Sequence, residues 1–347
     1  MDKNMNKNKK YKIIDIFSGC GGLSFGFEKT NKFETCVAID IWKVALETIK
    51  NNKQTDILQQ DLSKMNDEDI LKFKKKYGNI KIVVGGPPCQ GFSQAGQRNS
   101  KDPRNQLYKS YMNFIKTINP EWFVFENVAG LMSMKTLNNK NFIDEILNHF
   151  SLMGYKNTTL NLISAKDFGV PQYRKRVIII GNRVGIKVPQ LKIISKNNPL
   201  TVRDAIKDLE VLESGEKSKN DPYHFALNHA ERHIQWLKNV PEGMSAHDFK
   251  PNNGMTAKGY KTTYKRIWWD RPSPAITTCF SSISSQNNVH PSNTRALTIR
   301  EAMRLQTFPD DFIFSGSWRD IRTQIGNAVP PKLAEEVAKQ ILNFMGL

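Results

Sequence analysis

The sequence predicts an α/β protein whose parallel sheet carries helices on both faces, and three observations support this. Short apolar segments alternate with amphipathic segments from residue 12 to residue 181, which is the strand–helix rhythm of a parallel sheet. The first strand runs directly into a glycine-rich turn that opens a helix, as in α/β folds that bind nucleotides. From about Asn182 the alternation stops and the chain becomes irregular and polar, which indicates a second, smaller domain.

The elements of the first part follow one another at short intervals. Apolar runs predict the strands, and the segments between them have the spacing of amphipathic helices. The predicted strands cover residues 12–17, 35–39, 80–84, 122–125, 155–163 and 177–181, with a shorter one ending near Asp61 and Leu62. The predicted helices cover residues 42–50, 67–77, 107–118 and 141–153. Near the C-terminus, Thr298 with Glu301 predicts a capped helix, and residues 331–344 predict a helix that packs back onto the first domain.

The charge of the chain favours a polyanionic partner. Its 51 Lys and Arg residues against 33 Asp and Glu give a net charge of +18, and basic side chains bound to phosphates release condensed counterions. Biased composition is an alternative source of part of this charge, because the chain is also rich in Lys, Asn and Ile. No apolar run reaches the roughly 18 residues of a membrane span, and the polar residues 1–10 do not resemble a secretion signal. Four cysteines without Cys-x-x-Cys pairing favour a reducing, cytoplasmic location.

The glycine-rich loop at residues 18–26 predicts a cradle for an anionic or adenosyl ligand at the start of a helix. The dinucleotide fingerprint has a third glycine where this chain has Ser24, so a nicotinamide cofactor is disfavoured. The second strand ends at Asp40, at the distance beyond the loop where α/β nucleotide folds place an acid on ribose hydroxyls. A tight turn without a ligand is the alternative for the loop taken alone.

A rigid loop follows the strand at residues 80–84, where two glycines and two prolines precede Cys89. Cys89 is therefore either a thiolate nucleophile at a strand's carboxyl end or a buried structural cysteine. Glu126 ends another strand, which is where parallel sheets carry chemistry, although such residues are often solvated. Arg174 and Arg176 are predicted to point outward from an extended backbone, either to grip a phosphate or carbonyl oxygen or as a solvated basic edge.

Two other features give weaker signals. The polar residues 93–105 predict a mobile loop beside Cys89, with an ordinary surface loop as the alternative. His229 and His233 have the spacing of one helix face, and His224 precedes them. No cysteine or carboxylate completes a metal-ligand set with these histidines, so we expect no metal.

Six motifs, in this order and spacing, resemble those of the bacterial cytosine-5 DNA methyltransferases. The resemblance spans nearly the whole chain except its variable middle part, and six ordered motifs are far more specific than any one of them. The motifs are Asp15-Ile-Phe17-Ser-Gly-Cys-Gly-Gly22, Gly86-Pro-Pro-Cys89-Gln90, Glu126-Asn-Val128, Gln172-Tyr-Arg174-Lys-Arg176, Thr298-Ile-Arg-Glu301 with Phe308-Pro309, and Gly326-Asn-Ala-Val-Pro330.

The resemblance implies a Rossmann-like S-adenosylmethionine-dependent methyltransferase fold, with a mixed, mostly parallel sheet and helices on both faces. It also implies a smaller, irregular, β-rich target recognition domain. The implied catalytic domain covers residues 1–195 and 320–347, and the target recognition domain with its hinge covers residues 196–319. The implied methyl donor is S-adenosylmethionine, which leaves as S-adenosylhomocysteine. The positions that match the donor pocket of the family are Phe17, Gly19, Cys20, Gly21, Gly22, Asp40, Ile41, Asp61, Leu62, Gly86, Pro88, Leu107, Asn327 and Val329.

The resemblance also implies catalytic roles. Cys89 adds to C6 of the target cytosine, and Glu126, protonated or sharing a proton, holds N3 of the same base. Arg174 and Arg176 contact O2 of the base, the Glu126 carboxylate or the phosphate that flanks the base. The target base has to leave the duplex, because none of these atoms is reachable in the base stack. The implied DNA-contacting residues are Gln90, Ser93, Thr277 and Thr278.

Double-stranded DNA is the implied substrate, a monomer is usual for the family, and a cognate restriction endonuclease is a candidate functional partner. A transfer RNA cytosine-5 methyltransferase is one alternative, because Cys279-Phe280-Ser281 is similar to a Cys-Phe-Thr motif of that related branch. A catalytically inactive DNA-binding protein is another. The intact Cys89, Glu126 and Arg174 argue against the inactive protein.

Overall fold

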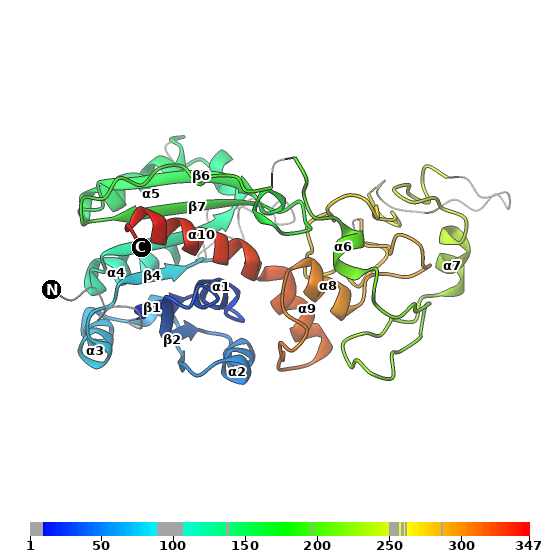
Figure 1. Ribbon diagram of the computed structural model, residues 1–347, viewed down its shortest axis with the longest axis horizontal. Helices are drawn as coiled ribbons and strands as arrows, with labels where there is room; N and C mark the ends of the chain where they lie inside the picture. Colours follow the sequence, from blue (N-terminus) through cyan, green and yellow to red (C-terminus); the bar gives the residue numbers. More distant parts are fainter. Residues whose placement is uncertain are drawn as a thin grey trace. The chain divides into compact units, whose positions relative to one another are not determined.

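The chain folds into two compact units (Figure 1). The structure, a computed structural model, describes residues 10–88, 107–136, 139–195, 197–249, 257, 260, 262–285 and 287–347. The first unit comprises Met1–Ser164, Lys175–Ile193 and Pro331–Leu347, and the second comprises Ala165–Arg174 and Ile194–Pro330. The sequence-based boundary at residue 195 is close to this division, whereas residues 165–174 and 320–330 group with the second unit. The role of that unit in target recognition stays a prediction.

One sheet of seven strands, counted over the described residues, forms the centre of the first unit. The strands are β1 (Tyr11–Ile16), β2 (Phe33–Asp40), β3 (Asp56–Gln59), β4 (Ile82–Gly85), β5 (Trp122–Val128), β6 (Asn157–Ser164) and β7 (Lys175–Asn182). Their order is β3-β2-β1-β4-β5-β7-β6. The first five in this order pair in parallel, and β7 runs antiparallel to both β5 and β6. The predicted mixed, mostly parallel sheet is therefore confirmed.

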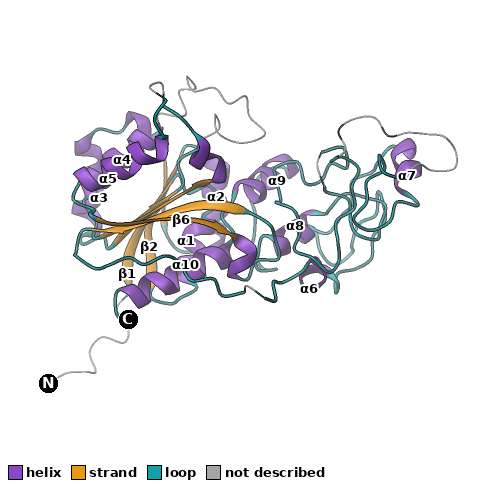
Figure 2. Ribbon diagram, turned by 90° about the horizontal axis from the view of Figure 1, so that it is seen from above, coloured by secondary structure: helices purple, strands orange, loops and turns teal. Residues whose placement is uncertain are grey.

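Helices cover both faces of this sheet, as predicted. They are α1 (Gly22–Glu28), α2 (Lys43–Asn52), α3 (Asp67–Tyr77), α4 (Leu107–Ile118), α5 (Phe142–Leu152) and α10 (Pro331–Phe344), with short 3-10 turns η1 (Leu62–Lys64) and η4 (Ala129–Ser133). Figure 2 shows α3, α4 and α5 on one face and α1 and α10 on the other. Within the described residues, no helix combines the length and the apolar character that crossing a membrane requires.

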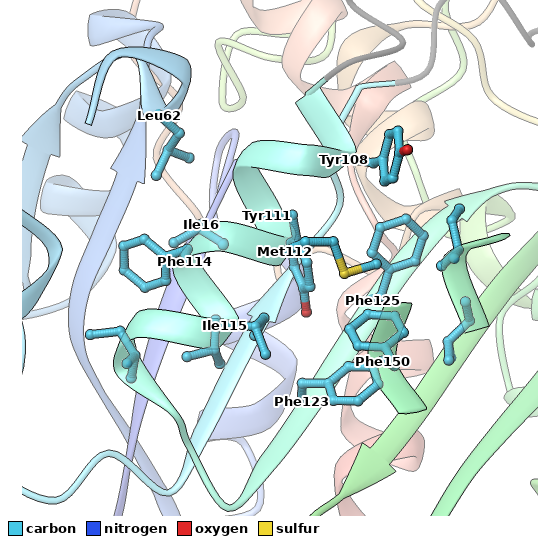
Figure 3. Close-up of a cluster of buried hydrophobic side chains, with 14 of the residues drawn as sticks. Ile16, Leu62, Tyr108, Tyr111, Met112, Phe114, Ile115, Phe123, Phe125 and Phe150 are labelled. Atoms are coloured by element: carbon cyan, nitrogen blue, oxygen red, sulfur yellow. The ribbon is translucent and has the colours of Figure 1, made fainter. Parts of the chain in front are cut away.

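The main core of the first unit lies under α4 and α5. The rings of Phe123 in β5 and Phe150 in α5 stack with centroids 3.8 Å apart (Figure 3). Phe125, two residues along β5, packs edge-to-face against Tyr111 of α4. The Tyr111 hydroxyl donates a hydrogen bond to the Val124 carbonyl at 2.9 Å. These contacts fix β5 up to the point where its C-terminal residues carry the candidate site.

The C-terminal helix packs closely against α1. A Cβ atom at Gly26 would lie 2.3 Å from the Pro331 carbonyl oxygen and 2.4 Å from the Ala334 Cβ. The absence of a side chain at residue 26 therefore lets the two helices touch through their backbones. The expectation that residues 331–344 pack onto the first domain is confirmed.

The second unit is irregular, as expected, but the described part of it is not β-rich. Its strand-like pairs are isolated bridges, such as Ser245 with Lys265. Buried side chains take over the hydrogen bonds that a ladder would make. The Arg266 guanidinium, for example, donates to the carbonyls of Leu237, Val240, His290 and Asn293. The α-helices in the described part of this unit are α6 (Val202–Ile206), α7 (Glu231–Leu237), α8 (Ile299–Leu305) and α9 (Trp318–Asn327).

The capping box predicted at the start of α8 is present. The Thr298 hydroxyl accepts the Glu301 N–H, and the Glu301 carboxylate accepts the Thr298 N–H. Arg295 adds a bidentate ion pair to the same buried carboxylate. Helix α9 (Trp318–Asn327) was not predicted from the sequence. A second capping box, Ser317 with Asp320, begins this helix and is the signal that marks it.

Candidate active site and donor loop

The loop between β1 and α1 turns sharply at its glycines. Gly19 and Gly21 have φ angles of 53° and 81°, a region that glycine enters at little cost. A Cβ atom at Gly21 would lie 2.9 Å from the Ile49 side chain of α2, whereas one at Gly19 would meet no atom within 4 Å. The loop is therefore packed against α2 on the Gly21 side and open at Gly19.

Asp40, at the end of β2, holds this loop. Its Oδ2 atom accepts the Gly19 N–H at 2.8 Å, and its Oδ1 atom accepts the Trp42 N–H at 2.8 Å. Each carboxylate oxygen keeps a second lone pair for a ligand hydroxyl. Burial raises the pKa of Asp40 above its ordinary value. The next residue, Ile41, is 65% exposed, so an apolar side chain is available for contact immediately after these acceptors in the chain.

The other residues of the first unit that are candidates for the methyl-donor pocket differ in their environments. Cys20 is buried, and burial raises the pKa of its thiol to about 12, so it is inert as a nucleophile. Leu62 belongs to the main core (Figure 3). Asp61 caps η1 by accepting the Ser63 N–H and hydroxyl. The remaining ones are Phe17 before the loop, Gly22 at the start of α1, Gly86 and Pro88 after β4, and Leu107 at the start of α4.

Asn327 and Val329 belong to the second unit, at the end of α9 and just beyond it. Thr277 and Thr278 also belong to this unit and lie against the end of α9. A Cβ atom at Gly326 would approach the Thr278 nitrogen to 2.4 Å and the Thr277 carbonyl carbon to 2.5 Å. The segment with the two threonines and the segment with Asn327 are therefore packed backbone to backbone.

The loop that leads to Cys89 is held by the end of β5. Cys89, Gln90, Ser93 and residues 93–105 lie outside the described residues. Just before them, the Asn127 amide donates to the Pro87 carbonyl at 3.0 Å. A Cβ atom at Gly86 would lie 2.8 Å from the Glu126 Oε2 atom. The carboxylate of Glu126 therefore sits directly against the backbone that precedes Cys89.

Glu126 forms an ion pair with Arg176 of β7. The Arg176 Nε atom lies 2.8 Å from the Glu126 Oε1 atom, and their side chains are 14% and 12% exposed. Arg176 is opposite Val128 in the β5–β7 ladder, so Glu126 is its diagonal neighbour. Burial lowers the pKa of Arg176, and the charge of Glu126 opposes this shift. The pair presents a carboxylate and a guanidinium side by side at a strand end.

Arg174 does not point outward, so the expectation that both arginines do so is wrong. Its side chain is 3% exposed and belongs to the second unit. The guanidinium donates to the carbonyls of Ile276, Gly326 and Ala328 at 2.8, 2.7 and 3.1 Å. β7 begins at Lys175, so Arg174 precedes the strand and does not share the alternation of Arg176. Arg174 therefore joins the threonine segment to the end of α9.

The histidines that the sequence singled out have structural partners. His224 bonds to Thr298 and to the Glu210 carbonyl, and the His229 ring accepts the Ala296 N–H. Among the residues that the structure describes, no three His, Cys, Asp or Glu side chains gather in a way that could hold a metal ion.

Sequence reasoning missed three residues of the site. Asn127 anchors the Pro87 carbonyl, and Lys53 reaches Ser24 in α1. Asp15 lies buried in β1, beneath the glycine loop. Asp15 and Asn127 fall inside two of the six motifs, which is the signal that could have found them. Lys53 lies in no motif, and only its three-dimensional contacts reveal it.

Asp15 gives rise to a testable prediction about stability. Its carboxylate is 1% exposed, and burial raises its pKa from 3.8 to about 6, although contacts with Ser24 and the charge of Lys53 oppose this shift. The folded protein therefore binds more protons than the unfolded chain between these pH values, so the carboxyl costs stability as pH rises through them. We expect Asp15→Asn to raise the free energy of unfolding by up to about 3 kcal/mol at pH 8.

The advantage of Asp15→Asn should shrink as pH falls from 6 towards 4. Thermal unfolding of both proteins across this range measures it. The change Asp69→Asn, at an exposed carboxylate of α3, is the control and should not show a gain that grows with pH. A variant at residue 15 that is less stable than the wild type at pH 8 contradicts the prediction.

Three features of the first unit are those of S-adenosylmethionine-dependent methyltransferases. A glycine loop follows β1, an acid stands at the end of β2, and the loop after β4 lies against the Glu126 carboxylate at the end of β5. The family model for C-5 cytosine-specific DNA methylase matches residues 11–343. The chain belongs to this family, whose members use S-adenosylmethionine to methylate cytosine in DNA.

Individual relatives agree with this assignment. The chain is 34% identical to the type II methyltransferase M.DdeI of Desulfomicrobium norvegicum, over 95% of this chain and 88% of that protein. It is 33% identical to the type II methyltransferase M.HindV of Haemophilus influenzae, over 96% and 97% of the two chains. A crystal structure of a prophage-encoded E. coli protein, described as a DNA modification methyltransferase, superposes with a TM-score of 0.76. The two chains are 26% identical, with 97% of this one and 100% of the other covered.

The described residues fit the donor that this family uses. The loop is open at Gly19, Asp40 keeps acceptor capacity for two hydroxyls, and the exposed Ile41 offers an apolar contact next to it. A nucleoside needs both kinds of contact, because its sugar is polar and its base has apolar faces.

Proposed function

We propose that this protein methylates C5 of a flipped-out cytosine in a specific short sequence of double-stranded DNA, through a covalent bond between Cys89 and C6. The observation that carries the proposal is the buried Glu126–Arg176 pair, set against Gly86 in the loop that leads to Cys89. A nucleophile, a group for N3 and a cation for O2 are the three groups that this chemistry needs.

The chain's own residues account for the main steps. The Cys89 thiolate adds to C6, and the electron pair of the C5–C6 bond moves towards N3 and O2. The Glu126 carboxyl group, protonated or sharing a proton, donates that proton to N3, and Arg176 faces O2, so both stabilise the negative charge that develops there. C5 then takes the methyl group that S-adenosylmethionine supplies. Loss of the C5 proton to a base or water restores the double bond and expels Cys89.

We assign Arg174 a positioning role in place of a contact with the base. Its guanidinium is engaged with three backbone carbonyls of the second unit, and this engagement holds residues 276–278 against residues 326–328. Gln90, Ser93, Thr277 and Thr278 remain the proposed DNA contacts. The proposed donor contacts are those that the resemblance implies, with Asp40 on the ribose and Asn327 and Val329 from the end of α9.

The net charge of +18 supports a nucleic acid as the substrate, and the type II relatives favour a cognate restriction endonuclease in the same cell.

In the deciding assay, the purified protein is given unmodified plasmid DNA or transfer RNA, each with labelled S-adenosylmethionine. We expect label on DNA alone, and bisulfite sequencing should place it on one cytosine within a short repeated sequence. Label on RNA alone, or on neither, overturns the proposal.

A further inference from the structure

Lys53 places a buried ammonium next to the donor loop. It follows α2 directly, and its side chain is only 9% exposed. The Nζ atom donates to the Ser24 hydroxyl at 2.8 Å and to the Thr35 hydroxyl at 3.1 Å, and it lies 3.5 Å from the Glu28 carboxylate. An ammonium has three N–H donors, so these partners from α1 and β2 use all of them.

Ser24 carries this contact to the glycine loop. Its side chain is fully buried, and its hydroxyl donates to the Gly21 carbonyl at 3.3 Å while it accepts from Lys53. The Gly21 carbonyl also accepts the Phe25 N–H at 2.8 Å and so begins α1. A continuous chain of hydrogen bonds therefore runs from Lys53 through Ser24 to the residue at which the loop becomes a helix.

Two buried or partly buried carboxylates share the charge of this ammonium. Glu28 of α1 lies beside it, and the positive charge of the ammonium lowers the pKa of Asp15 in β1. Asp40 raises the pKa of Asp15, because like charges repel. Loss of the ammonium charge would leave these acids uncompensated in a region of low dielectric constant.

We propose that Lys53 is a positioning residue of the donor site, which acts through Ser24 to hold the turn at Gly21 and the Gly19 N–H that Asp40 accepts. The inference rests on the proposed function, because it takes S-adenosylmethionine as the ligand of this loop. It adds a residue that lies outside the six motifs and that would act through Ser24, without needing a contact with the ligand itself.

Binding of S-adenosylhomocysteine, measured by titration calorimetry without DNA, tests the proposal independently of catalysis. We expect Lys53→Met and Ser24→Ala each to weaken binding by about 10-fold, the usual scale for a hydrogen bond to a charged group. The double variant should be hardly weaker than either single one, because both changes break the same chain. Lys50→Met, at an exposed lysine in the last turn of α2, is the control and should bind like the wild type.

The pH dependence of binding separates a charge effect from a packing effect. Burial lowers the pKa of Lys53, and Glu28 and Asp15 oppose this shift. The wild type should therefore lose affinity for S-adenosylhomocysteine as pH rises towards 10, at a lower pH than an ordinary lysine would titrate. Lys53→Met should lose less affinity than the wild type, because only the contributions common to both proteins, such as titration of the ligand's own amino group, remain in it.

The outcomes distinguish this proposal from the proposed function. If the wild type does not bind S-adenosylhomocysteine, the proposed function fails and takes this inference with it. If the wild type binds and Ser24→Ala binds equally well, the inference alone is wrong. Should Lys53→Met fail to fold, Ser24→Ala and the pH profile of the wild type still decide the question.

Discussion

Replacing Cys89 with serine is expected to lower the rate of methyl transfer to DNA by at least about 10³-fold, the scale seen when a covalent nucleophile is removed. A serine hydroxyl is almost entirely protonated near neutral pH, whereas a cysteine thiol, with an ordinary pKa of about 8.5, yields a useful fraction of thiolate. DNA binding should change little, because the variant differs by one atom. Incorporation of labelled methyl groups into unmodified plasmid DNA measures the rate.

The same pair of proteins should differ with DNA that contains 5-fluorocytosine. Fluorine at C5 cannot leave as a proton does, so the wild type should remain covalently bound while Cys89→Ser should not. Cys36→Ser is the matched control, since Cys36 lies within β2 and burial raises the pKa of its thiol to about 11. A trapped complex with Cys89→Ser, or equal activity of that variant, refutes the covalent mechanism.

The first unit was predictable because its local signals agree with its packing. Asn66 accepts the Asp69 N–H at the start of α3, and lysines occupy the last turn, so sequence and structure give the same helix at residues 67–77. The strands were found from their apolar runs, although β5 extends to Val128 and includes Glu126. Each such element could be identified from a stretch of about ten residues.

The second unit could not be predicted in the same way, because distant residues determine its order. The Arg266 guanidinium donates hydrogen bonds to the carbonyls of residues 237, 240, 290 and 293, and no local sequence pattern predicts such contacts. The two arginines of the Gln172–Arg176 motif show the same limit. They are two residues apart and chemically identical, yet one pairs with Glu126 and the other holds carbonyls of a separate segment. Which residue begins β7 decides this difference.

The site was predictable as a set of strand ends but not as a set of contacts. The carboxyl ends of β4 and β5 are neighbours in a parallel pair, so the meeting of residues 86–89 with Glu126 follows from the strand order. The anchor that Asn127 provides for Pro87 depends on one side-chain rotamer. The contact between Lys53 and Ser24 depends on how α2 ends.

Glu126→Gln should reduce the turnover of methyl transfer by roughly 10²- to 10⁴-fold, the usual range for a group that moves or holds a proton in the transition state. The amide keeps the size of the side chain, but it carries no charge and cannot hold or release the proton at N3. The KM for DNA should change much less than the turnover, because the charge on the base develops only after Cys89 has added. Initial rates over a range of DNA concentrations separate the two.

Glu145→Gln is the control for this change, because Glu145 is also a partly buried carboxylate of the first unit and accepts a hydrogen bond from Tyr108 at 2.6 Å. It should keep normal turnover. Glu126→Asp sharpens the test, since it retains the charge but withdraws the carboxylate from both Arg176 and Gly86. If position matters as much as charge, Glu126→Asp should be as slow as Glu126→Gln. Normal turnover of Glu126→Gln would remove this residue from the mechanism and leave its ion pair with Arg176 as a purely structural contact.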